Sequence, residues 1–234
     1  MQLQGLKCLV TGGSRGIGLA IGKKFAEEAA SVTLVARDAW KLEESVSLLP
    51  KVDSSQCHGF VSLDIENGWK EHCQHIQFMD IVVNCAGVSQ ASLLLSTDER
   101  SIRKILDVNL LGTILTTQAF LKPMLRAGKK SGQFLNISSI LALQGLRGTS
   151  VYSASKAGVI GFTKAIAEEM GPRNIKSNCL CLGLVDTEMG RTVSPEIRRK
   201  LLGSESEILT VERVAEEALD LVLSGNNGVI KELR

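Results

Sequence analysis

Residues 11–18 read Thr-Gly-Gly-Ser-Arg-Gly-Ile-Gly and follow directly on a short apolar run at residues 6–11. Glycines at positions 12, 16 and 18 allow a tight turn, a close approach of the backbone to a pyrophosphate and close packing of the next helix. A helix that begins here points its free N–H groups and positive dipole end at the phosphates. A glycine-rich turn alone can also be purely structural. Its place after the first strand of an alternating chain predicts a dinucleotide-binding turn made of Gly12, Ser14, Arg15, Gly16, Ile17 and Gly18.

Outward from this turn, short β-branched, apolar runs alternate with longer amphipathic stretches. This alternation is typical of βαβ units that build a parallel sheet covered on both faces. We expect strands near residues 6–11, 32–36, 58–63, 79–84, 132–138 and 175–182. We expect helices near residues 16–29, 38–49, 67–76, 98–127, 151–171, 195–202 and 210–223. No linker or repeat divides the chain, so residues 1–234 are predicted to form a single domain, a Rossmann-like doubly wound α/β fold with three α/β/α layers.

The composition limits the partners and the compartment. The 234 residues include 27 basic and 25 acidic ones, and a net charge of +2 excludes a global attraction to nucleic acid. No apolar run approaches the roughly 20 residues that cross a bilayer, and no charged-then-apolar leader precedes the first strand. The six cysteines form no CxxC pair, so we predict buried free thiols, a reducing intracellular compartment and no metal site.

The end of the second predicted strand indicates which dinucleotide binds. A fold that selects NAD usually places an acidic residue here for the ribose 2′-hydroxyl, whereas this chain reads Val35-Ala36-Arg37. Arg37 and Arg15 can hold a 2′-phosphate through charge-assisted hydrogen bonds, so we expect NADP (NADPH) as the cofactor. The alternative for Arg37 is a solvated residue at the start of a helix.

Tyr152 and Lys156 lie four residues apart in a predicted helix, so their side chains share one face. A nearby ammonium favours the phenolate, and we expect Lys156 to lower the pKa of Tyr152 from about 10 toward the working range of a general acid. Ser139 ends a predicted strand, where its hydroxyl would project from the carboxyl edge of the sheet. Each feature is common alone, but the combination behind the glycine-rich turn predicts a catalytic centre.

These segments resemble the short-chain dehydrogenase/reductase family over most of the chain. Residues 11–18 are similar to its TGxxxGIG turn, residues 84–87 (Asn-Cys-Ala-Gly) to its NNAG segment, and the Ser139, Tyr152 and Lys156 set to its catalytic residues. The resemblance implies that Tyr152 protonates the substrate oxygen and that Ser139 orients the carbonyl. Lys156 would hold the nicotinamide ribose.

The same resemblance implies further site residues. Asn109 in Val108-Asn109-Leu110 matches the family's helix asparagine and would anchor a water that relays protons to Lys156. Asp64 would lie beside the adenine, and the remaining cofactor contacts would come from Asn84, Ala86, Gly87, Val185 and Thr187. From the residues alone, Asn84 and Asn109 can equally pair with backbone groups, and Asp64 can cap a helix.

Within the family, the chain most resembles 3-oxoacyl-acyl-carrier-protein reductases of the fungal mitochondrial type. The segments that carry this resemblance are residues 86–94, 148–157 and 169–175. It implies a 3-oxoacyl substrate linked to acyl carrier protein or coenzyme A, with the mitochondrial matrix as compartment and the cytoplasm as the alternative. A basic rim for the acidic carrier would consist of Arg126, Lys129, Lys130 and Arg173, unless these are merely solvated cations.

Two departures from the family pattern are visible. Leu182 stands where the family usually has a proline, so we expect a looser loop and weaker ordering of the cofactor. The chain ends with residues 225–234, without the Asp-Gly-Gly that the family pattern has here, so we expect a seventh strand that is at best vestigial and a sheet edge that is exposed or paired differently. A homo-oligomer, dimer or tetramer, is still expected.

Other functions remain open at this level. The substrate loop at about residues 187–209 carries Met189, Val193, Ile197 and Leu201, which can line an acyl channel or pack on the sheet. The same mechanism would serve a carbonyl reductase or alcohol dehydrogenase acting on small ketones, quinones, steroids or polyols. A further alternative is a non-catalytic cofactor-binding subunit of a heteromeric reductase. The intact catalytic set argues against it.

Overall fold

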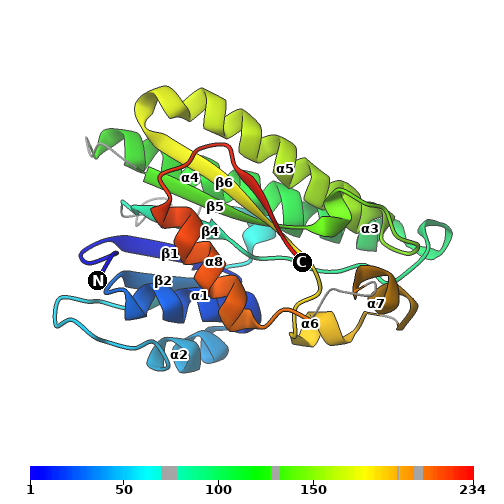
Figure 1. The fold of residues 1–234 in the computed structure, drawn as a ribbon, viewed down its shortest axis with the longest axis horizontal. Helices are drawn as coiled ribbons and strands as arrows, with labels where there is room; N and C mark the ends of the chain where they lie inside the picture. Colours follow the sequence, from blue (N-terminus) through cyan, green and yellow to red (C-terminus); the bar gives the residue numbers. More distant parts are fainter. Residues whose placement is uncertain (70–77, 128–131, 194, 203–207) are drawn as a thin grey trace.

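A seven-stranded parallel sheet organises the molecule (Figure 1). The computed structural model describes residues 1–69, 78–127, 132–193, 195–202 and 208–234. The strand order is β3-β2-β1-β4-β5-β6-β7, which confirms the predicted doubly wound α/β class. The strands are β1 Lys7–Thr11, β2 Ser31–Ala36, β3 Gly59–Ser62, β4 Ile81–Asn84, β5 Gly132–Ser139, β6 Ile175–Leu182 and β7 Ile230–Leu233.

Helices cover both faces of the sheet, because strands buried on both sides need an apolar layer above and below. One face carries α1 (Gly16–Glu27), α2 (Ala39–Ser47) and α8 (Val211–Leu223), and the other carries α3 (Glu99–Leu106), α4 (Gly112–Arg126) and α5 (Ser150–Met170) (Figure 1). The short helices α6 (Glu188–Arg191) and α7 (Pro195–Leu202) lie beyond the carboxyl end of β6.

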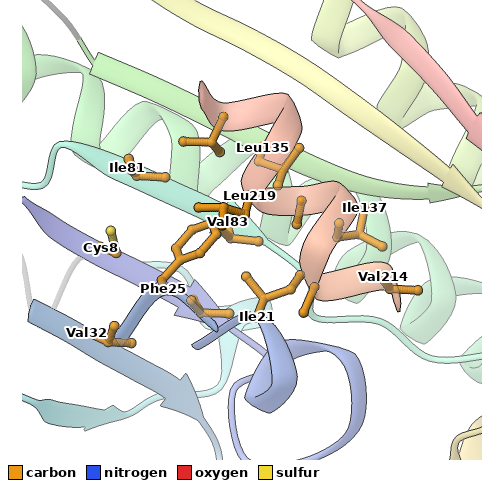
Figure 2. Packing of buried hydrophobic residues seen from close by; sticks show 14 of the residues in the cluster. Cys8, Ile21, Phe25, Val32, Ile81, Val83, Leu135, Ile137, Val214 and Leu219 are labelled. Atoms are coloured by element: carbon orange, nitrogen blue, oxygen red, sulfur yellow. The ribbon is translucent and has the colours of Figure 1, made fainter. Parts of the chain in front are cut away.

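The larger core lies between the sheet and helices α1 and α8 (Figure 2). Ile21 and Phe25 of α1 pack beside Val214 and Leu219 of α8, and both pairs lie over strand residues such as Val83. Phe25 is fully buried, a position worth about 1.5–3 kcal/mol relative to an exposed side chain. This packing fixes α1, and therefore the glycine-rich turn before it, against the carboxyl end of β1.

The opposite face has its own core around α4. Phe120 and Met124 pack with Phe134 of β5, and the Trp69 ring meets Phe120 edge-on at a centroid distance of 5.0 Å. Helix α5 covers β6 through Val159 and Ile160. The apolar periodicity of the sequence predicted helices in these two regions, and the structure has helices there.

The stretch 98–127, predicted as one helix, contains an irregular turn. Helices α3 and α4 are joined by a π-helical turn at Asp107–Leu111, which holds Asn109. Such turns are short insertions in a helix and often lie at functional sites. The helix predicted near 67–76 falls largely outside the described residues, and the described stretch before it holds a separate 3₁₀ turn at Ile65–Asn67 that ends at Gly68.

The prediction of a vestigial seventh strand is wrong. Strand β7 pairs in parallel with β6 over four residues, from Cys179 opposite Ile230 to Leu182 opposite Leu233. Side chains fix the preceding turn, since Asn227 accepts from the Ser177 N–H at 2.9 Å and Asn178 accepts from the Val229 N–H at 3.0 Å. The edge of β6 is therefore covered, because its backbone groups find partners in even a short strand.

Two further expectations can be compared with the structure. Among the described residues, no helix is both long and apolar enough to cross a membrane. Cys8, Cys179 and Cys181 are buried free thiols and Cys85 is partly buried, whereas Cys57 is exposed, contrary to the expectation of burial. Cys73 lies outside the described residues.

Candidate active site

One cavity of about 940 Å³ opens at the carboxyl ends of the strands, where the fold predicts a ligand. The last residues of β1, β2, β5 and β6 all belong to its lining. Most of the predicted site residues line it: Gly12, Ser14, Arg15, Gly16, Ile17, Gly18, Arg37, Asp64, Ala86, Gly87, Ser139, Tyr152, Lys156, Val185 and Thr187. Asn84 and Asn109 are absent from this lining.

The glycine-rich turn forms one wall. Gly12 has a φ of +68°, and a Cβ there would lie 3.0 Å from the Ala86 backbone, while one on Gly18 would collide with the Gly12 carbonyl oxygen. Thr11 holds the two segments together, because its Oγ1 accepts from the Cys85 N–H (3.0 Å) and the Ala86 N–H (3.2 Å). No side chain caps the start of α1, so its first N–H groups suit a pyrophosphate.

Cations gather where β2 ends. Arg37 and Lys41 line the cavity, are exposed and form no ion pair with a described residue. Arg15 instead forms an ion pair with Glu188 at the start of α6. Lys41 carries no sequence motif, although its place in the first turn of α2 after Arg37 could have suggested it. The end of β2 therefore offers two unpaired cations to a 2′-phosphate, which suits NADP.

Asp64 combines the two roles that the sequence left open. Its Oδ1 accepts from the Glu66 N–H at 3.4 Å and so caps the 3₁₀ turn after β3. The residue also lines the cavity on the side of Arg37. A capping carboxylate and a cofactor contact are compatible here, because the cap uses only one of its oxygens.

Ser139, Tyr152 and Lys156 come together on the opposite wall. Ser139 ends β5, where its Oγ accepts from the Leu141 N–H (3.2 Å) and donates to the Leu182 carbonyl (3.3 Å). The Lys156 Nζ donates to the carbonyl of Ile137 at 2.8 Å and lies 6.0 Å from the centroid of the Tyr152 ring. Two segments, the end of β5 and helix α5, thus supply a hydroxyl, an acid and an ammonium to one place.

The expected acidification of Tyr152 by Lys156 is wrong for these groups. Burial raises the pKa of Tyr152 to about 12, and a hydrogen bond with Ser139 offsets only part of this rise. Burial also lowers the pKa of Lys156. The desolvation of the phenol outweighs the distant ammonium, so Tyr152 is held as a protonated phenol, which is the form that donates a proton.

The two asparagines support the site from behind. The Asn109 side chain accepts from the Val88 N–H (2.8 Å) and donates to the Val88 carbonyl and to Ser155, both at 3.0 Å. Gly87 separates it from Lys156, because a Cβ there would lie 3.4 Å from Asn109 Oδ1 and 3.6 Å from Lys156 Nζ. Asn109 therefore fixes the loop after β4 through its side chain.

Asn84 joins strands instead of reaching the cavity. Its Nδ2 donates to Asn136 (2.8 Å) and Thr117 (3.2 Å), which ties β4 to β5 and to α4. Asn84 is a strand-end residue, as the alternative left open by the sequence had it. Its side chain pairs with other side chains, however, and not with backbone groups.

The segment after β6 closes the substrate side of the cavity. Its apolar side chains line the cavity: Met189, Val193, Ile197 and Leu201. The choice between lining an acyl channel and packing on the sheet is thus settled in favour of the cavity. Despite Leu182 in place of proline, backbone bonds hold this segment, with Gly183 N–H to Leu233 (2.8 Å) and Asp186 N–H to Leu209 (2.8 Å).

A family profile described as short chain dehydrogenase matches residues 7–198, which contain the glycine-rich turn and the catalytic set. The chain belongs to the short chain dehydrogenase family. It is therefore an NAD(P)-dependent oxidoreductase acting on CH–OH and C=O groups.

Relatives of this dehydrogenase include enzymes named for different substrates. The 3-oxoacyl-acyl-carrier-protein reductase of Chlamydia muridarum is 36% identical over 204 residues, covering 83% of this chain and 79% of the relative. Carbonyl reductase family member 4 of Xenopus tropicalis is 36% identical over 182 residues, covering 78% and 76%. A solved structure with bound NADP, a provisionally assigned 2-deoxy-d-gluconate 3-dehydrogenase from Agrobacterium tumefaciens, is 28% identical with a TM-score of 0.87 and covers 99% and 96%.

Gln90 is a site residue of this dehydrogenase that the sequence did not reveal. It is buried, and its Oε1 accepts from the N–H groups of Val151 (2.8 Å) and Tyr152 (3.1 Å). Its Nε2 donates to the Ser92 carbonyl and to Thr97. Gln90 thus caps the start of helix α5 from another segment and fixes the backbone of Tyr152. The sequence shows no local pattern for this role, because donor and acceptor are about 60 residues apart.

The predicted basic rim lies far from this centre within one chain. Arg126 ends α4 and Arg173 follows α5, so both are exposed at the amino ends of β5 and β6. Helix α5 has 21 residues, or about 30 Å at 1.5 Å per residue, and it separates Arg173 from the end that carries Tyr152. Lys129 and Lys130 lie outside the described residues.

Proposed function

We propose that this dehydrogenase reduces 3-oxoacyl thioesters to 3-hydroxyacyl thioesters with NADPH, in fatty-acid synthesis. The observation that carries the proposal is the apolar wall formed by Met189, Val193, Ile197 and Leu201 in the same cavity as Tyr152. An acyl chain needs such a wall beside the reacting carbonyl. The 36% identity to a 3-oxoacyl-acyl-carrier-protein reductase supports the same substrate class.

The charges at the end of β2 support NADPH over NADH. Arg37 and Lys41 offer unpaired cations there, and no acidic residue follows Ala36 directly to repel a 2′-phosphate. The uncapped start of α1 and the glycines of the turn fit the pyrophosphate. When bound, the cofactor supplies the hydride that forms the new C–H bond at the substrate carbonyl carbon.

The chain's own residues supply the proton and the geometry. Tyr152 donates its phenolic proton to the carbonyl oxygen, forming the O–H bond of the product and leaving a phenolate that must be reprotonated. Ser139 hydrogen-bonds the same oxygen and orients it, while Lys156 would hold the nicotinamide ribose. Gln90 holds the backbone of Tyr152, and Asn109 holds the loop after β4 at Val88, so neither acts on the carbonyl directly.

We also propose that an acidic carrier protein docks on Arg126 and Arg173 of a homo-oligomer. Both are exposed cations, which suits an acidic partner. Because α5 places them about 30 Å from Tyr152, a carrier docked there would serve the cavity of a neighbouring subunit. Double reversal to Glu would then raise KM for the carrier-bound substrate while leaving KM for the coenzyme A thioester unaffected.

A carbonyl reductase acting on small ketones is the second candidate, favoured by the 36% identity to carbonyl reductase family member 4. Initial rates with NADPH and NADH on acetoacetyl carrier protein, acetoacetyl coenzyme A and small ketones separate the two. We expect NADPH and the thioesters to be preferred. Turnover of small ketones alone would refute the thioester proposal, and a preference for NADH would refute the cofactor assignment. A Tyr152→Phe enzyme as active as wild type would show that the chemistry assigned to Tyr152 is wrong.

A further inference from the structure

Arg147 is an exposed cation at the catalytic end of the cavity. It lies three residues before helix α5 and five before Tyr152, and both residues line the cavity. We propose that Arg147 binds the phosphate of a phosphopantetheine arm, at the point where the arm of a bound thioester leaves the cavity. This inference rests on the proposed thioester substrate.

A rigid turn presents the Arg147 side chain. The Leu146 carbonyl accepts from the Thr149 N–H (3.2 Å) and from Thr149 Oγ1 (2.8 Å), and Gly148 adopts a φ of +83°. Thr149 is buried, and a Cβ on Gly148 would lie 3.8 Å from the Ser92 backbone. The turn is thus fixed at its base, and its first central residue is displayed outward.

The charges of the cavity lining distinguish Arg147 from its neighbours. Arg15 pairs with Glu188, and Arg191 pairs with Asp186 at 2.9 Å. Lys156 is buried and donates to a backbone carbonyl. Arg147 forms no ion pair or side-chain hydrogen bond with any described residue. Of the exposed cations that line the catalytic and substrate end, it is thus the one without an anionic partner among the described residues.

The chemistry of the substrate class supplies that partner. A thioester of phosphopantetheine has a reactive carbonyl at one end of a neutral arm and a phosphate at the other. With the carbonyl at Tyr152 and the acyl chain on the apolar wall, the arm leaves the cavity on the open side. A guanidinium there can hold a phosphate through two parallel hydrogen bonds. The arm occurs both on carrier protein and in coenzyme A, so the shared ligand is the phosphate.

This site is separate from the proposed docking surface. Arg126 and Arg173 lie at the other end of α5 and would contact the folded carrier. Arg147 would contact the arm itself. Loss of Arg147 should therefore affect coenzyme A and carrier-protein substrates alike, whereas loss of the docking cations should affect only the carrier protein.

The test uses Arg147→Gln with three substrates: acetoacetyl carrier protein, acetoacetyl coenzyme A, and the acetoacetyl thioester of N-acetylcysteamine, which lacks phosphate. We expect kcat/KM for both phosphate-bearing substrates, relative to the phosphate-free thioester, to fall about tenfold, mainly through KM. Arg147→Lys should retain part of the ratio. Arg100→Gln, an exposed position on α3 outside the cavity lining, is the matched control and should keep the wild-type ratio.

An unchanged ratio would overturn the inference while leaving the proposed function intact. A fall confined to the carrier-protein substrate would place Arg147 on the carrier surface and would also overturn it. If wild-type enzyme reduces small ketones and none of the three thioesters, the proposed function itself fails. Thermal unfolding of each variant, with an unchanged midpoint, shows that the ratios report binding. The larger wild-type kcat/KM identifies which source of the phosphate the enzyme uses.

Discussion

At the cofactor end of the cavity, two short segments at the carboxyl ends of β1 and β2, residues 11–18 and 35–37, form one wall. At the catalytic and substrate end, the wall comes from segments scattered between Gln90 and Leu201. The first end is local, because a turn and the helix after it need only nearby residues to take shape. The second exists only when the sheet brings β5, α5 and the segment after β6 together. Mutations should therefore act differently at the two ends.

The largest expected effect is at the assembled end. Tyr152→Phe removes the proton donor without changing the packing of the ring, so we expect kcat to fall by about 10³-fold. The dissociation constant for NADPH, measured by fluorescence, should change little. A fall of less than about tenfold would mean that another group supplies the proton.

At the cofactor end, a substitution in the glycine-rich turn should lower the stability of the fold. Gly18→Ala would drive a methyl group into the Gly12 carbonyl, and we expect about 3 kcal/mol of destabilisation in urea unfolding. Gly161→Ala, at an exposed position of α5, is the matched control, since a Cβ there meets nothing within 4 Å. That control should stabilise the protein by up to about 1 kcal/mol. Equal effects at the two positions would show that the turn tolerates a side chain.

Cofactor choice should respond to a single local residue. Arg37→Ala removes one of the unpaired cations at the end of β2, so kcat/KM for NADPH should fall about tenfold while that for NADH stays near the wild-type value. Lys41→Ala tests the neighbouring cation in the same assay. A parallel loss with both cofactors would remove the assignment of Arg37 to the 2′-phosphate.

Gln90 tests whether the assembled end depends on long-range support. Gln90→Leu leaves the N–H groups of Val151 and Tyr152 without their acceptor, and we expect kcat to fall about fivefold. KM for NADPH should remain unchanged, because Gln90 acts on the catalytic helix. Should kcat stay constant while only the thermal midpoint drops, the role of Gln90 is structural alone.

The pH profile gives the smallest effect near neutrality. Reduction needs a protonated Tyr152, whose pKa burial raises to about 12, so the acid form persists throughout the neutral range. The ammonium of Lys156 has a lowered pKa, so activity should fall first on the alkaline side as this group loses its proton. We expect kcat/KM for reduction to vary less than about twofold between pH 6 and 8. An alkaline limb centred near pH 7 would contradict this expectation.

Particular residues show where sequence analysis succeeded. The positions of the first six strands along the chain followed from alternating apolar runs, and Tyr152 and Lys156 were placed on one helical face by their spacing. The seventh strand was missed because four residues carry little periodicity, and the Asn226-Asn227-Gly228 turn that positions it works through side-chain bonds to β6. The π-helical turn around Asn109 left no mark on an otherwise regular helical pattern.

The sequence by itself determined the glycine-rich turn, the cationic end of β2 and the shared helical face of Tyr152 and Lys156, because these depend on residue types at short, fixed spacings. Only the tertiary structure decided that Gln90 caps α5, that Arg147 stands unpaired at the cavity and that the loop after β6 lines the substrate side. It also decided the protonation of Tyr152, because the pKa depends on desolvation by residues brought together from distant segments. Sequence spacing shows which groups are present, whereas burial in the folded protein sets their pKa values.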